Sequence, residues 1–118
     1  MTTKSGIQLR TGSHTSVGQI RENNEDSLHL WTSSGYVVAV VADGMGGAAA
    51  GEEASRLAVE AVKNSLPLFS AKPNTLLEQM PELTIASELG AAIHNANETI
   101  VTRAAVDPEM RGMGTTIT

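Results

Sequence analysis

The feature that most constrains this chain is a short apolar run that ends on an acidic, glycine-rich segment. Tyr36–Ala42 reads Tyr-Val-Val-Ala-Val-Val-Ala, and Asp-Gly-Met-Gly-Gly follows at 43–47. A continuous run of this kind, rich in β-branched residues, predicts a strand that is covered on both faces. The run is far shorter than the ~20 apolar residues that a membrane-spanning helix requires. We therefore expect a buried strand with a carboxylate at its end.

The segments on either side of this strand predict a domain that contains both helices and strands. Alternating apolar residues indicate a second strand, and apolar residues at helical spacing indicate two helices. The expected elements are a weak strand over 7–15 with a turn at 16–18, a strand over 26–32, of which 28–32 forms a hairpin with 36–42, a helix from about 51 to 66, a loop over 67–81, a helix from about 82 to 104, and a strand that begins within 113–118.

Composition narrows the possible functions. The chain has 118 residues, of which 13 are acidic and 8 are basic, so its formal net charge is −5. This length fits one domain, and the scattered basic residues argue against nucleic-acid binding. The absence of cysteine excludes a disulfide framework, a thiolate metal site and a cysteine nucleophile. With no secretory signal visible, we expect a cytoplasmic protein that binds neither membranes nor nucleic acids.

The first candidate segment is Arg-Glu-Asn-Asn-Glu-Asp at 21–26. A solvated turn before a strand would explain it. Alternatively, Arg21 binds a planar oxyanion in bidentate fashion, and Glu25 or Asp26 helps to hold a hard cation. Successive strand residues face opposite sides of a sheet. We therefore expect only one of these two carboxylates to point into the site, with the other in a structural role.

The second candidate segment begins with the carboxylate of Asp43. An isolated buried Asp is costly and needs a partner, which Mg²⁺ or Mn²⁺ would supply because both favour oxygen ligands. Glycines without side chains would let a backbone carbonyl, such as that of Gly44, reach the same ion. A tight turn with Asp43 as a helix N-cap is the simpler interpretation.

The same segment also fits a dinucleotide-binding fingerprint. Gly44, Gly46 and Ala49 match the G-x-G-x-x-G/A pattern between a strand and a helix. However, Asp43 would place a negative charge beside a pyrophosphate. In addition, the acidic residue expected about 20 positions later falls in the predicted helix or its loop. We keep a dinucleotide-binding fragment as a less favoured alternative.

A third segment, Gly-Met-Gly-Thr-Thr at 112–116, is only a β-prone stretch when taken alone. Together and in this order, the three segments resemble the metal-dependent protein phosphatase 2C family (PPM type), and its bacterial members most. Met45 stands where many eukaryotic members have a histidine linked to proton donation, so no such donor is implied here. The resemblance covers essentially the whole chain but only the N-terminal half of the family domain, so residues 1–118 are expected to be part of one phosphatase domain.

The resemblance implies an α+β fold, a four-layer αββα sandwich in which helices flank two antiparallel sheets. It implies two or more Mn²⁺ or Mg²⁺ ions, bridged by Asp43 and bound by the Gly44 carbonyl. Glu25 or Asp26 would support the site, one of them through water, and Arg21 would grip the substrate phosphate. The implied activity is hydrolysis of protein phosphoserine or phosphothreonine by a metal-activated water, in signalling opposed to a serine/threonine kinase.

The family's later acidic motifs have no counterpart in these 118 residues. Two divalent ions carry +4, whereas Glu25, Asp26 and Asp43 supply at most −3. We therefore expect the isolated chain to bind Mn²⁺ weakly and to show little or no phosphatase activity. A non-catalytic, phosphatase-like interaction module is the alternative from another functional class.

Overall fold

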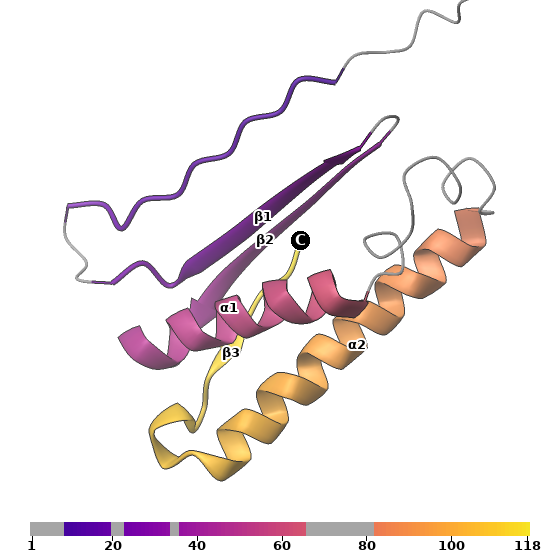
Figure 1. Cartoon of the computed structure of the whole chain (residues 1–118). Coiled ribbons are helices and arrows are strands. Elements are labelled where there is room, and N and C mark those ends of the chain that lie inside the picture. The colour runs from indigo at the N-terminus through magenta and orange to yellow at the C-terminus, as the bar shows by residue number, and fades with distance from the viewer. Residues whose placement is uncertain (1–8, 20–22, 34–35, 66–81) are drawn as a thin grey trace, which may run out of the picture.

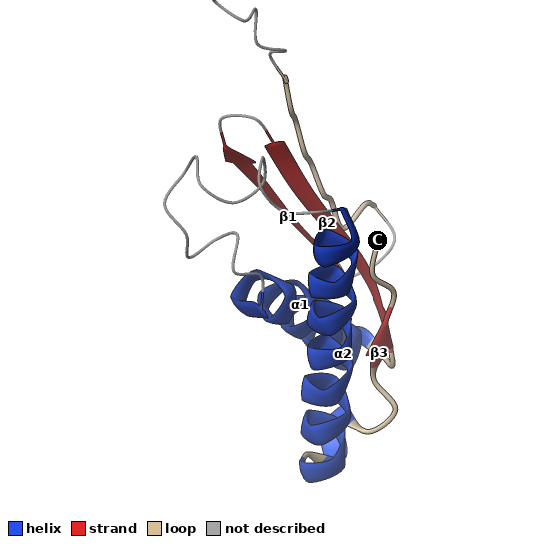
Figure 2. Ribbon diagram, turned by 90° about the vertical axis from the view of Figure 1, so that its right-hand side faces the viewer, coloured by secondary structure: helices blue, strands red, loops and turns tan. Residues whose placement is uncertain are grey.

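The structure is a computed structural model that describes residues 9–19, 23–33, 36–65 and 82–118. In this part of the chain, one antiparallel sheet has the strand order β1-β2-β3. Helices α1 and α2 lie on the same side of the sheet (Figures 1 and 2). The elements are β1 (Asp26–Ser33), β2 (Tyr36–Met45), α1 (Ala48–Ser65), α2 (Glu82–Val106), the 3₁₀ turn η2 (Pro108–Met110) and β3 (Gly114–Thr115). The predicted mixed fold and the predicted hairpin are therefore confirmed.

Strand β2 is longer than the sequence predicts. It continues past Ala42 to Met45 because both of its edges are paired there. Asp26 of β1 is the register partner of Asp43, and β3 pairs with Gly44 and Met45 on the other edge. The antiparallel ladder then runs on to the end of the chain, where Val41 and Thr118 exchange two backbone hydrogen bonds of 2.9 Å. Asp43 therefore lies within a central strand rather than after its end.

The two faces of β2 differ, and the expectation that both are covered is wrong for the described residues. Val40 and Ala42 are buried against α1, whereas Val41 and Met45 are 51% and 64% exposed. We call the uncovered side the open face; it carries the side chains of Asp26, Leu28, Val41, Asp43 and Met45. The sequence run is apolar on both sides, but both described helices lie on only one of them.

Small residues make the core between the sheet and the two helices. Alanine dominates the positions where the elements meet, so the backbones approach closely. The buried apolar residues are Val40, Ala42, Ala50, Ala54, Ala58, Val59, Val62, Ala92, Ala96, Ile100 and Met113.

Helix α1 begins at Ala48, three residues before the predicted start. Gly46 and Gly47 have φ values of +118° and +89°, which turn the chain from β2 into the helix. A Cβ on Gly46 would also lie 2.8 Å from the Cα of Met113, so this turn requires glycine for both its conformation and its space. Helix α2 extends two residues past the predicted end near Ala104 and stops before Asp107, whose side chain caps η2.

The predicted weak strand over 7–15 is wrong for residues 9–15, which are exposed and pair with no described strand. The earlier residues of that segment lie outside the described part, as does the predicted loop over 67–81. The expected turn at 16–18 is present: Gly18 has φ +77°, and its N–H donates to the Ser16 hydroxyl at 3.2 Å.

An ion-pair network links the two helices. Arg56 donates to Glu53 at 2.8 Å and to Glu60 at 2.6 Å along α1, and Arg103 of α2 approaches Glu53 at 4.0 Å. The hydrogen bond from Arg56 lowers the pKa of Glu53 below its ordinary 4.5, and the positive charges of Arg56 and Arg103 act in the same direction.

A buried hydroxyl pair fastens α1 to β1. Ser55 is 0% exposed, and its oxygen lies 2.8 Å from the Ser27 hydroxyl. Ser55 also donates to the Glu52 carbonyl at 3.1 Å, so its oxygen accepts from Ser27. We expect Ser55→Ala to lower the free energy of unfolding by about 1 kcal/mol, because it leaves the part-buried Ser27 hydroxyl without this acceptor.

Urea denaturation checks this prediction, with Thr99→Ala as the control. The Thr99 hydroxyl is exposed and bonds only within α2, to the Asn95 carbonyl at 2.8 Å, so its loss is expected to stay within about 0.5 kcal/mol. The double variant Ser27→Ala/Ser55→Ala should lose less than the sum of the two single changes. Additive losses would contradict a coupled hydroxyl pair.

Candidate metal centre

Two carboxylates lie side by side at the glycine-rich end of the hairpin. Asp26 and Asp43 are direct register partners on β1 and β2. Directly opposed residues project on the same face with Cβ atoms about 4.5–5.5 Å apart. Both are exposed on the open face. The expectation of a buried Asp43 is therefore wrong for the described residues, as is that of an N-cap, because Asp43 lies inside β2 and α1 begins only at Ala48. Within the described ranges, neither forms a salt bridge with a lysine or arginine. Opposed like charges are destabilising, and a divalent cation between them would remove that cost.

Glu25 lies on the other side of the sheet from this pair. Its backbone carbonyl accepts from the Gly44 N–H at 3.0 Å. Its carboxylate lies over the start of α1, because a Cβ added to Gly51 would be only 2.6 Å from Glu25 Oε1. The positive end of a helix dipole favours a carboxylate at this position. The two carboxylates therefore face opposite sides, with Asp26 beside Asp43 and Glu25 against the helix. Which of them supports a cation stays a prediction.

Gly44 is required by close packing rather than by its backbone conformation. A Cβ at this position would lie 1.9 Å from the Gly51 carbonyl oxygen and 2.8 Å from the Glu25 carbonyl oxygen. Its φ is not positive, unlike those of Gly46 and Gly47. The crossing of β2, α1 and the residue before β1 therefore leaves room only for glycine. A role for its carbonyl in cation binding stays a prediction.

Arg21 lies outside the described residues, so its position relative to Asp43 is not part of the geometry. The neighbouring Asn24 is described, and it has a role that its sequence context did not predict. Its side-chain oxygen accepts from the Asp26 N–H at 3.1 Å, and its amide donates to the Thr15 hydroxyl at 2.7 Å. Asn24 therefore fixes the start of β1 directly before the first carboxylate. An Asn two residues before a strand is a known turn signal.

The third segment contributes Thr116 to the same end of the sheet. Thr116 donates its N–H to the Asp43 carbonyl at 2.9 Å, and its side-chain Oγ1 accepts from the Asp43 N–H at 3.1 Å. Residues 73 positions apart are thus joined by two hydrogen bonds. Taken alone, the sequence of this segment indicates no function, because hydrogen bonds across a sheet leave no local pattern.

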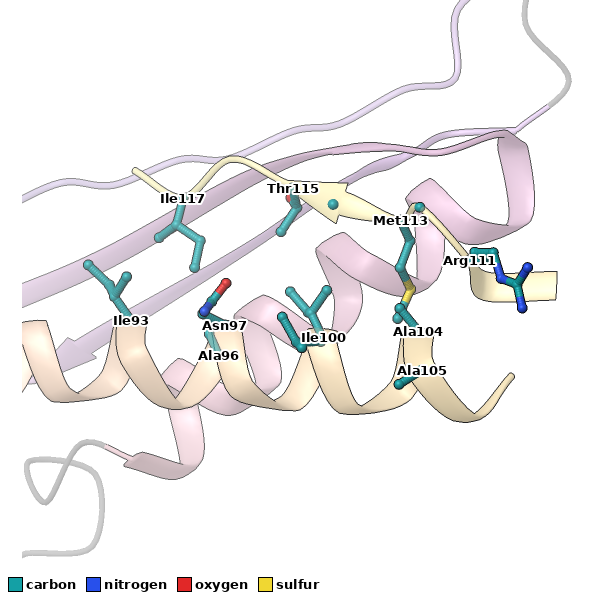
Figure 3. A pocket seen from close by; sticks show the side chains of 13 residues that line it. Ile93, Ala96, Asn97, Ile100, Ala104, Ala105, Arg111, Met113, Thr115 and Ile117 are labelled. Atoms are coloured by element: carbon teal, nitrogen blue, oxygen red, sulfur yellow. The ribbon is translucent and has the colours of Figure 1, made fainter. Parts of the chain in front are cut away.

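A separate groove lies on the helix side of the sheet. It encloses about 730 Å³ between α2 and the C-terminal segment. Figure 3 shows Ile93, Ile100, Met113 and Ile117 along it and Arg111 at one end. Thr115 and Ile117 line it, so it lies on the opposite face from Thr116, Asp43 and Asp26. This groove is mostly apolar and contains no acidic side chain.

The donor set on the open face fits a hard cation but is incomplete. It consists of two carboxylates and a neighbouring hydroxyl, all oxygen donors of the kind that Mg²⁺ and Mn²⁺ prefer. No group of three His, Asp or Glu side chains that could hold an ion occurs among the described residues. An octahedral ion takes about six oxygen ligands. The described residues would therefore supply one side of a site and leave the remaining positions to water or other groups.

The chain belongs to the protein phosphatase 2C family. The family model described as "Protein phosphatase 2C" matches residues 12–118, which include all three candidate segments. The antiparallel pairing of β2 and β3 also differs from the parallel βαβ unit that the dinucleotide fingerprint requires.

Two curated relatives and one solved structure show what the chain is similar to. It is 34% identical over 112 residues to the serine/threonine protein phosphatase PstP of Mycobacterium tuberculosis. This match covers 95% of this chain and 19% of that protein. It is 35% identical over 101 residues to the serine/threonine phosphatase stp of Listeria monocytogenes. This match covers 85% of this chain and 37% of that protein. The chain thus spans well under half the length of these relatives.

The solved structure is the catalytic domain of PstP in complex with two manganese ions. It is 35% identical, with a TM-score of 0.60, over 86% of this chain and 37% of that chain. The mixed helix and strand arrangement described above is therefore one that occurs in solved phosphatases. Neither of the two described helices is long and apolar enough to cross a bilayer.

Proposed function

We propose that this chain is the N-terminal part of a metal-dependent protein serine/threonine phosphatase domain. The observation that supports it most is the opposed pair of Asp26 and Asp43 on the open face. The family assignment and the manganese-bound neighbour agree with this proposal. The substrates would be phosphoserine and phosphothreonine in proteins, and the activity would oppose a serine/threonine kinase in cytoplasmic signalling.

In this proposal each residue has a distinct task. Asp43 would bridge two Mn²⁺ or Mg²⁺ ions, and Asp26 would hold one of them directly or through water. Glu25 would support the site from the helix side, consistent with its carboxylate over Gly51. Arg21 would bind the phosphate, and the Gly44 carbonyl would bind one ion. When bound, the ions would lower the pKa of a water and offset charge on the phosphoryl oxygens.

The open face supports the larger architecture that we propose, a four-layer αββα sandwich of which residues 1–118 form only part. Val41 and Met45 are 51% and 64% exposed there, and adjacent apolar side chains on a sheet favour burial. A second antiparallel sheet packed on this face would cover them. It would also bring further oxygen ligands to the edge where Asp26 and Asp43 lie.

The described ligands predict that the isolated chain is nearly inactive. With millimolar Mn²⁺, we expect little or no turnover of p-nitrophenyl phosphate, because the three candidate carboxylates, Glu25, Asp26 and Asp43, do not compensate the charge of two divalent ions. Calorimetry should nevertheless detect Mn²⁺ binding with a Kd on the order of 1 mM or weaker. Robust turnover that Asp43→Ala abolishes would contradict the predicted inactivity. Complete absence of Mn²⁺ binding would favour the alternative of a non-catalytic interaction module.

A further inference from the structure

The ladder between β2 and the C-terminal segment is irregular at one residue pair, Asp43 and Thr116. At the next hydrogen-bonded pair, Val41 and Thr118 exchange two backbone bonds, as a regular antiparallel ladder requires. At Asp43, only the bond from the Thr116 N–H to the Asp43 carbonyl is a backbone bond. The Asp43 N–H is bound instead by the Thr116 side-chain oxygen at 3.1 Å.

The irregular pair is stable because the Thr116 carbonyl has another hydrogen-bond partner. The carbonyl oxygen of Thr116, which would accept from Asp43 in a regular ladder, accepts from the Thr115 hydroxyl at 2.9 Å. The Thr116 carbonyl therefore has a different partner, and the Thr116 side chain accepts from the Asp43 N–H in its place. Because Thr116 is the cross-strand neighbour of Asp43, its Cβ projects on the same open face as the carboxylate pair, while its Oγ1 turns back to the Asp43 N–H. Asp26, Asp43 and Thr116 thus form a row across three neighbouring segments.

The Thr116 hydroxyl can form one further hydrogen bond, as a donor. A threonine hydroxyl has one proton to donate and two lone pairs. The contact with the Asp43 N–H uses a lone pair, so the proton remains for an oxygen on the open face. Thr116 is exposed, and the nearest acidic side chain across the ladder is Asp43 itself. A hydrogen bond to a carboxylate oxygen or to a cation-bound water would fix the orientation of that ligand.

We propose that Thr116 is a positioning residue for the cation site, which holds Asp43 through its side chain. This inference rests on the proposed function, since it assigns the task of Asp43 to cation binding. Thr116 fixes the backbone of Asp43 at the irregular pair through its Oγ1 and its N–H, and its hydroxyl proton would be free to bind a ligand oxygen or a cation-bound water. Partners of this kind, which orient a metal ligand without touching the metal, typically change metal affinity by 10–100-fold.

The test compares Mn²⁺ affinity in four variants of the full chain, measured by calorimetry. Thr116→Val removes the hydroxyl at nearly constant shape and should weaken Mn²⁺ binding about tenfold. Thr116→Ser keeps the hydroxyl and should remain within about twofold of the parent chain, well inside that range. Thr118→Val is the matched control, because Thr118 is two residues further along the same C-terminal segment but pairs with Val41 through its backbone. Asp43→Asn reports whether Mn²⁺ binds at this site.

Hydrogen exchange at the Val41 amide, which donates to the Thr118 carbonyl at 2.9 Å, monitors the strand itself. Unchanged exchange together with weaker binding in Thr116→Val, and recovery in Thr116→Ser, would support the inference. Parent-like affinity in Thr116→Val, or faster Val41 exchange that serine does not restore, would overturn it. If Asp43→Asn itself leaves Mn²⁺ affinity unchanged, the proposed function fails and the inference fails with it.

Discussion

Replacing Gly44 with alanine is expected to disrupt the part of the fold that holds the candidate site. The added Cβ would lie 1.9 Å from the Gly51 carbonyl oxygen, 2.5 Å from the Gly51 carbonyl carbon and 2.8 Å from the Glu25 carbonyl oxygen. All three atoms belong to the backbone, so no side-chain rotation can relieve the overlap. Relief requires α1 to move away from β2, which would open the core around Ala42 and Ala54. We expect the free energy of unfolding to fall by about 3 kcal/mol or more.

The matched control is Gly90→Ala in α2. A Cβ there meets nothing within 4 Å, and Gly90 does not have a positive φ. Alanine in a helix interior is favoured over glycine by about 0.5–1 kcal/mol, so this variant should be slightly more stable than the parent chain. Thermal and urea denaturation of both variants would measure the contrast. A Gly44→Ala chain as stable as the parent would show that α1 does not approach β2 as closely as described.

The second large effect is expected for Asp43→Asn, in opposite directions with and without metal. Without metal, the change removes the repulsion between the opposed carboxylates of Asp26 and Asp43 and should raise stability by about 0.5 kcal/mol. With Mn²⁺, it removes a charged ligand rather than a supporting contact. Since supporting contacts alone change metal affinity by 10–100-fold, we expect a loss of at least about 100-fold. In calorimetry at millimolar Mn²⁺, the binding heat of the parent chain should therefore disappear in this variant.

Thermal denaturation gives an independent measurement of the same effect. Mn²⁺ that binds only the folded chain raises the melting temperature of the parent, and this rise should vanish in Asp43→Asn. Glu98→Gln is the control for the change in net charge, because Glu98 is 67% exposed on α2 and lies 3.3 Å from His94. It should retain the parent's Mn²⁺ response. If both variants lost the Mn²⁺-dependent rise in melting temperature equally, Mn²⁺ binding would depend on the net charge of the chain rather than on the carboxylate pair.

Much of the local structure could be predicted from the sequence. The hairpin and both helices follow from apolar periodicity and from the continuous β-branched run at 36–42, which are local properties of the sequence. Element ends were less predictable: β2 continues to Met45 because of pairing on both edges, and the run 9–15 forms no strand despite its sequence. The open face could not be predicted, since an apolar run indicates that a strand is to be buried but not which partner covers each side.

The sequence by itself determined the order of the three segments, the family they indicate and the position of each candidate carboxylate along the chain. The strict alternation of side chains also predicted that Glu25 and Asp26 would face opposite sides. Only the tertiary structure decided that Asp26 is the one beside Asp43, that Gly44 is glycine because α1 crosses it, and that Thr116 binds Asp43 from the C-terminal segment. Register and helix crossing are set by contacts between residues distant in the chain, and no local pattern records them.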